Sequence, residues 1–170
     1  MLETKDLILA KAKFSDWEDM LHNVWSHPVC AQYMYWQVTT DPESAKQRME
    51  RTIAFQKAHN TYLVYEKATG RAIGFAGVES FDPDICMETG ICLGPAYQRR
   101  GYGKQILRCL MDYGKTHLKA RTFLYFTREE NQPSIALARS LGFTFVSAEE
   151  KLDEKTGLPY QMQKYSASLI

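Results

Sequence analysis

The sequence predicts a single domain of the α/β class, with mixed α and β elements and helices on both faces of a mixed sheet. Segments with the apolar period of a strand alternate along the chain with segments that have the period of a helix. The chain has 170 residues, which is enough for one domain with a substantial core and short for two. No repeat, low-complexity stretch or Pro/Gly/Ser-rich linker divides it, so residues 1–170 are expected to form one domain.

The N-terminal third is predicted to contain one strand and two helices. Residues 7–12 alternate apolar and polar side chains, which is typical of a strand. Ser15 and Glu18 have the spacing of a capping box, so a helix is expected to begin directly after the serine. Asp41 and Pro42 favour a second helix start, because Asp can cap a helix and Pro suits its first position.

The remaining chain is predicted to alternate strands with two further helices. A hairpin turn at 67–70 joins the first two of these strands, and Gly142 is a natural residue just beyond the end of the last helix. The predicted strands are 61–66, 72–80, 87–93, 122–127, 143–147 and 160–165, and the predicted helices are 103–115 and 133–141.

Composition excludes several classes of protein. Lys and Arg number 21 against 20 Asp and Glu, and a net charge of +1 gives no support to a nucleic-acid or membrane-surface partner. Residues 1–14 contain no apolar run of signal-peptide length, and no window resembles a membrane span, so a cytoplasmic protein is expected.

The cysteine pattern predicts reduced thiols. Four cysteines are present, none of them in a C-x-x-C pair, and no His-x-x-x-His pair accompanies them. This spacing argues against a zinc site or a disulfide framework, so we expect no metal. The four residues are Cys30, Cys86, Cys92 and Cys109.

The most informative segment is 95–104, between a predicted strand and a predicted helix. Gly101 and Gly103 let the backbone approach a ligand and turn N–H groups into a common space. The helix N-terminus adds about half a positive charge, so the segment predicts an anion cradle suited to a pyrophosphate. Side-chain charge comes from Arg99, Arg100 and Lys104.

Two other phosphate-binding loops are excluded by single residues. A dinucleotide-binding fingerprint needs a third glycine three residues after Gly103, where Ile106 stands. A Walker loop needs a glycine at the position of Gln98 and Ser or Thr at that of Gln105.

The flanking sequence resembles the GNAT N-acetyltransferase superfamily. Residues 98–103, Gln-Arg-Arg-Gly-Tyr-Gly, match its Gln/Arg-x-x-Gly-x-Gly/Ala signature. About thirty residues later, Asn-Gln-Pro-Ser at 131–134 and Leu-Gly-Phe at 141–143 resemble its second motif. Residues 88–93 with Pro95 resemble the branch that contains the ribosomal-protein alanine N-acetyltransferases.

The resemblance implies a fold and a cosubstrate. The central sheet would be mostly antiparallel, with strands 87–93 and 122–127 parallel and splayed apart to admit the pantetheine of acetyl-CoA. Backbone amides of 99–104 would hold the CoA pyrophosphate, and Asn131 would reach the pantetheine. The implied cofactor-binding residues are Cys92, Leu93, Gln98, Arg99, Arg100, Gly101, Tyr102, Gly103, Lys104 and Asn131.

The resemblance also suggests which residues act in catalysis. Glu88 matches a Glu of the related branch and is the candidate general base, with Glu79 as the alternative. Many family members place a Tyr general acid where this chain has Ala138, so the usual acid is absent. Ser134 stands where the branch places a hydroxyl near the CoA sulfur and is the candidate acid; a plain helix-start role is equally consistent.

The acceptor is left open by the sequence. An aromatic segment with Trp25, Tyr33, Tyr35 and Trp36 could bind a cation or a flat substrate, or simply pack on the sheet. Candidate acceptors are a protein N-terminus, a polyamine, an amino sugar or another small amine, with a slight preference for a peptide N-terminus. The alternatives are a CoA-binding sensor without catalysis and a protein-interaction module, and either a monomer or a homodimer is compatible.

Overall fold

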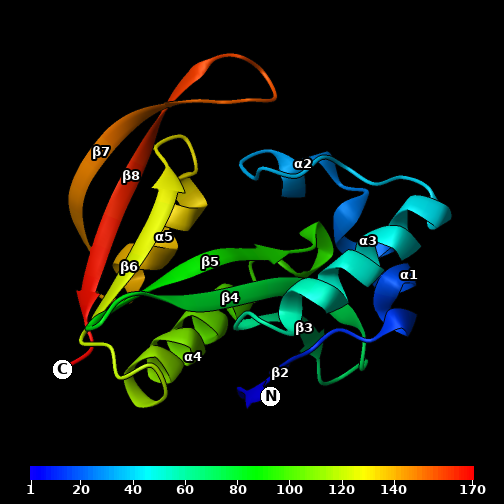
Figure 1. Cartoon of the computed structure of the whole chain (residues 1–170), viewed down its shortest axis with the longest axis horizontal. Helices are drawn as coiled ribbons and strands as arrows, with labels where there is room; N and C mark the ends of the chain where they lie inside the picture. Colours follow the sequence, from blue (N-terminus) through cyan, green and yellow to red (C-terminus); the bar gives the residue numbers. More distant parts are fainter. The chain divides into compact units, whose positions relative to one another are not determined.

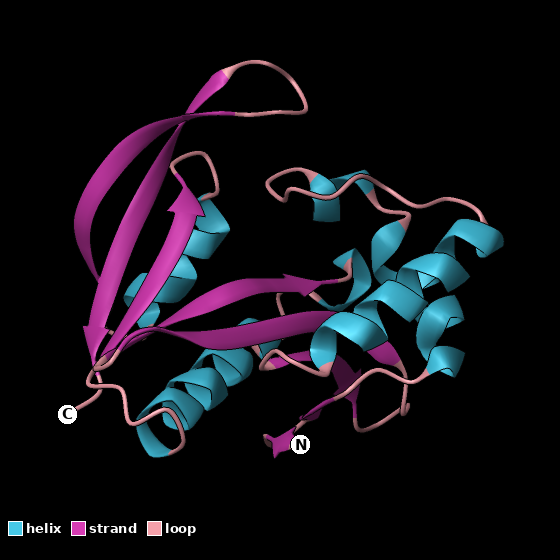
Figure 2. Cartoon of the chain, viewed as in Figure 1, coloured by secondary structure: helices cyan, strands magenta, loops and turns pink.

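The computed structural model describes residues 1–170, which form eight strands and five α-helices with short 3₁₀ and π turns between them (Figures 1 and 2). The strands are β1 (Leu2–Glu3), β2 (Leu7–Ala10), β3 (Thr61–Glu66), β4 (Ala72–Asp82), β5 (Ile85–Leu93), β6 (Thr122–Arg128), β7 (Thr144–Leu152) and β8 (Pro159–Ser168). The helices are α1 (Trp17–Met20), α2 (Pro28–Ala31), α3 (Pro42–Gln56), α4 (Tyr102–Thr116) and α5 (Gln132–Ser140).

The strands form one mixed sheet, as predicted, in the order β1-β2-β3-β4-β5-β6-β8-β7. β5 runs parallel to β6, with Ile85 opposite Thr122 and Met87 opposite Leu124. The pairs β1–β2, β2–β3, β3–β4, β6–β8 and β7–β8 are antiparallel. β8 therefore lies between β6 and β7, and Figure 1 shows it there.

The residue contacts group into two compact units, 1–78 with 89–109 and 79–88 with 110–170. In the first unit, the helices between β2 and β3 share a core with the strands. Met20 and Val24 belong to this core together with Met49 of α3 and Leu63 of β3, and all four side chains are buried. Since Leu63 faces this cluster, Val64 faces the other side of β3, and it is fully buried as well.

A π-helical turn interrupts the first helical segment of this unit. The turn, Leu21–Trp25, follows α1 directly, and its backbone bonds span one residue more than those of an α-helix. Trp25 ends the turn with its side chain buried, and its carbonyl accepts a hydrogen bond from the amide of Thr39 at 2.9 Å. The turn thus links the start of the unit to the loop that precedes α3.

The second unit packs aromatic rings between α5 and the strands β6 and β8. Phe123 of β6 meets Phe143 edge to face, with ring centroids 5.8 Å apart, and Tyr125 also contacts Phe143. On α4, a Cβ added to Gly114 would lie only 2.6 Å from the sulfur of Cys86. The close approach of α4 to β5 therefore requires glycine at this position.

The predicted elements are present, with changes at their ends. Strand 7–12 ends at Ala10, and β7 and β8 extend well beyond the predicted 143–147 and 160–165. The short elements β1 and α2 were not predicted, because two or four residues carry no readable period. No helix is both long and apolar enough to cross a membrane.

The two predicted helix starts had different outcomes. At the second, Asp41 accepts a hydrogen bond from the amide of Ser44 at 2.8 Å, which confirms the cap. The predicted Ser15 and Glu18 capping box is wrong. Asp16 instead accepts from the backbone amide of Lys13 at 2.7 Å, because the first turn is a 3₁₀ turn that begins two residues earlier, at Phe14.

Candidate functional site

The predicted phosphate cradle is a run of backbone amides at the start of α4. The first helical hydrogen bond runs from Gln105 N to Gly101 O at 3.2 Å. The six amides of residues 99–104 therefore have no acceptor within the protein, as expected before and in the first turn of a helix. Arg99 and Gly101 have φ of 61° and 78°, so the backbone alternates its handedness and its N–H groups can converge on one anion.

Only some of the charged side chains around these amides are free to meet a ligand. Arg99 and Lys104 are exposed and carry no ion pair. The guanidinium of Arg100 lies 3.3 Å from the buried carboxylate of Glu66, and the hydroxyl of Tyr102 donates to the same oxygen at 2.9 Å. Arg100 and Tyr102 therefore anchor the loop, and Arg99, Lys104 and the helix N-terminus supply the free positive charge.

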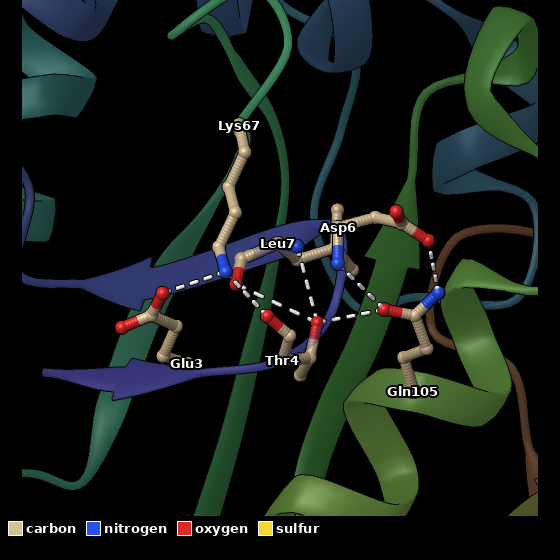
Figure 3. A network of polar contacts seen from close by, with 6 residues as sticks. All are labelled: Glu3, Thr4, Asp6, Leu7, Lys67 and Gln105. Atoms are coloured by element: carbon tan, nitrogen blue, oxygen red, sulfur yellow. Dashed lines mark hydrogen bonds and ion pairs between the residues drawn. The ribbon is translucent and has the colours of Figure 1, made fainter.

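A polar network fixes the first turn of α4 (Figure 3). The side-chain oxygen of Gln105 accepts from the Thr4 hydroxyl at 2.7 Å and from the Asp6 amide at 3.1 Å. Its amide nitrogen donates to Asp6 Oδ2 at 2.7 Å. Lys67 adds a bond to the Thr4 carbonyl and an ion pair with Glu3, both at 2.6 Å. The cradle is thus held by the turn between β1 and β2, and Gln105 was not predicted to have this role.

The end of β5 is tied to its own loop. Gln98 donates through Nε2 to the Leu93 carbonyl at 2.9 Å, and the thiol of Cys30 lies 3.7 Å from the same oxygen. Cys92 is buried beside Cys30, and this contact lowers the pKa of Cys30, while the contact and burial together raise the pKa of Cys92. The side chain of Gln98 and the carbonyl of Leu93 therefore hold the loop and strand together.

The candidate base lies in the second unit, where β5 and β6 run side by side. Glu88 is buried at 9% exposure, and one of its carboxylate oxygens accepts from the backbone amide of Phe126 at 3.2 Å. The register places Glu88 next to Tyr125, since Met87 pairs with Leu124. The side chain of Glu88 thus bonds a backbone amide of β6 that could otherwise bond the backbone of a neighbouring strand.

The candidate acid Ser134 has a partner that the sequence analysis missed. Its hydroxyl lies 2.8 Å from the hydroxyl of Tyr125. Burial, and secondarily the negative charge of Glu88, raise the pKa of Tyr125, so its phenol keeps its proton at neutral pH. The structure therefore brings Glu88, Tyr125 and Ser134 into one cluster. Tyr125 could have been found from its position in the short aromatic strand 122–127, which pairs in parallel with the strand that carries Glu88.

Asn131 occupies the N-cap of α5. Its side-chain oxygen accepts from the amide of Ser134 at 3.3 Å, which starts the helix and orients the serine. Ala138, where many relatives are expected to have a tyrosine, is fully buried in the core.

The predicted aromatic segment is only partly brought together. The Arg48 guanidinium lies over both indole rings, 4.6 Å from the ring centroid of Trp25 and 4.4 Å from that of Trp36. Tyr35 is 78% exposed. The cation that meets these two indoles is thus one of the protein's own side chains.

Comparison with known proteins shows the family to which the chain belongs. The family model described as "Acetyltransferase (GNAT) domain" matches residues 6–144. The uncharacterized N-acetyltransferase p20 of Bacillus licheniformis is 29% identical over 172 residues, which cover 99% of this chain and 90% of that protein. The N-alpha-acetyltransferase RimI of Mycobacterium tuberculosis is 33% identical over 115 residues, 64% of this chain and 68% of that protein.

Solved structures share the fold. A GNAT-family acetyltransferase from Bacillus anthracis superposes with a TM-score of 0.84 at 16% identity, covering 99% of this chain and 98% of that one. The acetyltransferase yncA from Salmonella typhimurium, solved with its cofactor acetyl-CoA, gives 0.71 at 19% identity over 98% and 95%. Spermidine N-acetyltransferase from Vibrio cholerae, solved with CoA and spermine, gives 0.77 at 14% identity over 98% and 97%.

Proposed function

The chain belongs to the family of GNAT acetyltransferases, and from this premise we propose how its residues carry out the reaction. It is an acetyl-CoA-dependent N-acetyltransferase, and we take residues 1–170 to work as one acetyltransferase domain. The acceptor is a primary amine, either a small molecule or a peptide N-terminus. Four cysteines without disulfides suit a reducing compartment, so a cytoplasmic location is part of the proposal.

The observation that carries the proposal is the run of unpaired amides at 99–104. Six consecutive N–H donors, two left-handed residues and a helix N-terminus fit a diphosphate better than a neutral ligand. Arg99 and Lys104 add charge at an exposed site, where long flexible side chains can follow the phosphates. When bound there, acetyl-CoA would supply an acetyl thioester, whose thiol is set free when the acetyl group is transferred.

Glu88 acts as the general base in this proposal. An amine attacks only in its neutral form, so one proton of the ammonium must be removed before or during attack. Glu88 is a carboxylate held in place by the amide of Phe126, and it can accept that proton directly or through a water molecule. No covalent enzyme intermediate is needed, because the amine can attack directly once it is positioned.

Ser134 acts as the proton donor to the departing thiolate, with Tyr125 behind it. The two hydroxyls are 2.8 Å apart, and the raised pKa of Tyr125 keeps its phenol protonated. A proton given up by Ser134 can therefore be replaced from Tyr125 along one hydrogen bond, and Tyr125 regains its proton from Glu88, which has accepted one from the amine. Asn131 supports this pair by fixing the amide of Ser134.

The proposal is tested by the rate of thiol release from acetyl-CoA in Glu88→Gln, with alanine- and serine-starting peptides and spermidine as acceptors. Glu88→Gln keeps an acceptor for the Phe126 amide and removes the base, so we expect turnover to fall about 10²-fold or more. Glu79→Gln is the matched control and should keep wild-type turnover. Wild-type turnover in Glu88→Gln would overturn the assignment, and a loss confined to Glu79→Gln would move the base to that residue.

A further inference from the structure

The first unit contains a cavity of about 320 Å³ between α3 and the strands β3 to β5. This volume is in the range of sites for small molecules. Its walls come from helix, strand and loop residues far apart in the sequence. The lining residues used below are Trp25, Trp36, Arg48, Arg51, Thr61 and Thr89.

The cavity contains positive charge without a carboxylate to balance it. Arg48 and Arg51 both line it, and no Asp or Glu does. Arg48 donates through Nη1 to the Gln37 carbonyl at 3.2 Å and to the Thr39 hydroxyl at 3.0 Å, both neutral acceptors. Burial, and then the charge of Arg51, lower the pKa of Arg48 to about 10, so it stays protonated at neutral pH. An anion entering the cavity would meet two guanidiniums that no protein carboxylate neutralises.

Two residues that line the cavity each bury a polar atom without a partner. The indole nitrogen of Trp36 and the hydroxyl of Thr61 make no hydrogen bond. Both atoms are covered, so they do not face the open space of the cavity. The positive charge of the cavity is therefore the feature that a ligand would meet.

The strand next to Thr61 leaves room for its methyl group. A Cβ on Gly77 of β4 would overlap the Thr89 hydroxyl and would lie 2.6 Å from the Thr61 methyl. The two threonines therefore close over Gly77, and a larger residue there would have to displace them. Thr89 also lines the cavity.

We propose that this cavity binds a small organic anion, a carboxylate or a phosphate attached to an apolar body. The inference concerns the first unit alone and is independent of the proposed acetyl transfer. Arg48 and Arg51 bind the anion. The apolar body packs on Phe75 and the indole edges, which also line the cavity.

A cationic ligand such as a polyamine fits the same cavity poorly. The Arg48 guanidinium already lies over both indole rings, 4.6 and 4.4 Å from their centroids. Any further cation would be repelled by both arginines and would find no carboxylate. The anion is thus favoured by charge and by the cation already present at the two rings.

The test measures binding by calorimetry, so that it does not depend on the catalytic reaction. The probes are 3-phenylpropanoate, its neutral amide 3-phenylpropanamide and the cation 3-phenylpropylamine, with phenyl phosphate to tell a carboxylate site from a phosphate site. We expect the tighter of the two anions to bind about tenfold or more above the amide, because hydrogen bonds to charged groups are the strong ones. The amine should not bind measurably.

Two variants locate the binding. Arg48→Gln and Arg51→Gln should each weaken anion binding at least about fivefold, and Arg139→Gln, an exposed arginine of α5, should leave it unchanged. The inference is overturned if the amide or amine binds as tightly as the anions, if neither anion binds, or if both cavity variants bind like wild type. Acetyl-CoA is titrated in parallel: if it fails to bind, the proposed function fails, whereas normal acetyl-CoA binding without anion binding defeats this inference alone.

Discussion

Two arginines of this protein stack on aromatic rings, one in each unit. Their surroundings differ in whether a carboxylate balances the charge and in how deeply the side chain is buried. Arg128 lies 3.8 Å from the ring of Tyr160, and its guanidinium meets the carboxylate of Asp153 at 2.7 Å. Arg48 lies against two indole rings but has no carboxylate partner. Arg128 is buried at 9% exposure, while Arg48 is half-buried beside an open cavity.

The difference separates a charge used for structure from a charge available to a ligand. In a buried ion pair the two charges neutralise each other, so the pair holds structural elements together and needs no further charged partner. An unbalanced charge next to unpaired polar atoms is stabilised when a complementary ligand arrives. In the first unit the charge of Arg48 has no carboxylate partner, whereas in the second unit Asp153 balances the charge of Arg128, whose Nε is nevertheless buried without a partner.

The largest effect is expected when the ion pair between Arg128 and Asp153 is broken. Arg128→Met leaves Asp153 buried without its partner, and breaking a buried pair destabilises strongly, so thermal unfolding should begin about 10 °C lower. Arg48→Met removes a charge that has no carboxylate partner and should shift the midpoint by less than about 3 °C. Calorimetric unfolding of both variants checks this, and equal shifts would remove the distinction between the two arginines.

A pH titration of stability gives a smaller effect at the same pair. The hydrogen bond from Arg128, followed by that from the Lys155 amide, lowers the pKa of Asp153 in the folded protein. A depressed pKa stabilises the fold fully above the unfolded value of about 4, and the contribution is lost as the pH falls through the folded pKa. The difference in unfolding temperature between wild type and Asp153→Asn should therefore be largest near pH 7 and should shrink as the pH falls below about 4. A gap that stays constant down to pH 3 would contradict the ion-pair account.

The smallest effect is expected at Thr61, whose hydroxyl has no partner. Thr61→Val removes the hydroxyl that has no partner and keeps the shape of the side chain, so the midpoint should stay level or rise by about 1 to 3 °C. Thr127→Val, at another buried threonine whose hydroxyl does have a bond, is the control and should lower it. A clear loss of stability in Thr61→Val would mean that its hydroxyl is satisfied.

The sequence predicted what depends on neighbouring residues. The cradle at 99–104 is built from consecutive amides and glycines, so its chemistry is visible in one segment. The Asp41 cap is local in the same sense. The capping box at Ser15 was wrong even though it is local, because Asp16 competes for the same role and forms the box with Lys13.

Contacts between distant segments were not predicted. Tyr125 reaches Ser134 only because the loop after β6 folds α5 back over that strand. In the same way, the indoles of Trp25 and Trp36 were noted as an aromatic wall, but Arg48 comes from α3, and the pattern of that helix gives no sign that it contacts both rings. Periodicity gives the buried face of an element and does not give the partner that this face meets.

The measurement that tests the central claim most directly is a calorimetric titration of acetyl-CoA into wild type, Gly101→Glu and Gly101→Asn. Both variants carry the strain of a side chain at φ 78°, which Asn tolerates best, but only Glu places a negative charge in the cradle. We predict that wild type binds, that Gly101→Asn binds more weakly, and that Gly101→Glu shows no binding. If wild type fails to bind acetyl-CoA, or if Gly101→Glu binds as wild type does, the amides of 99–104 are not the cofactor site.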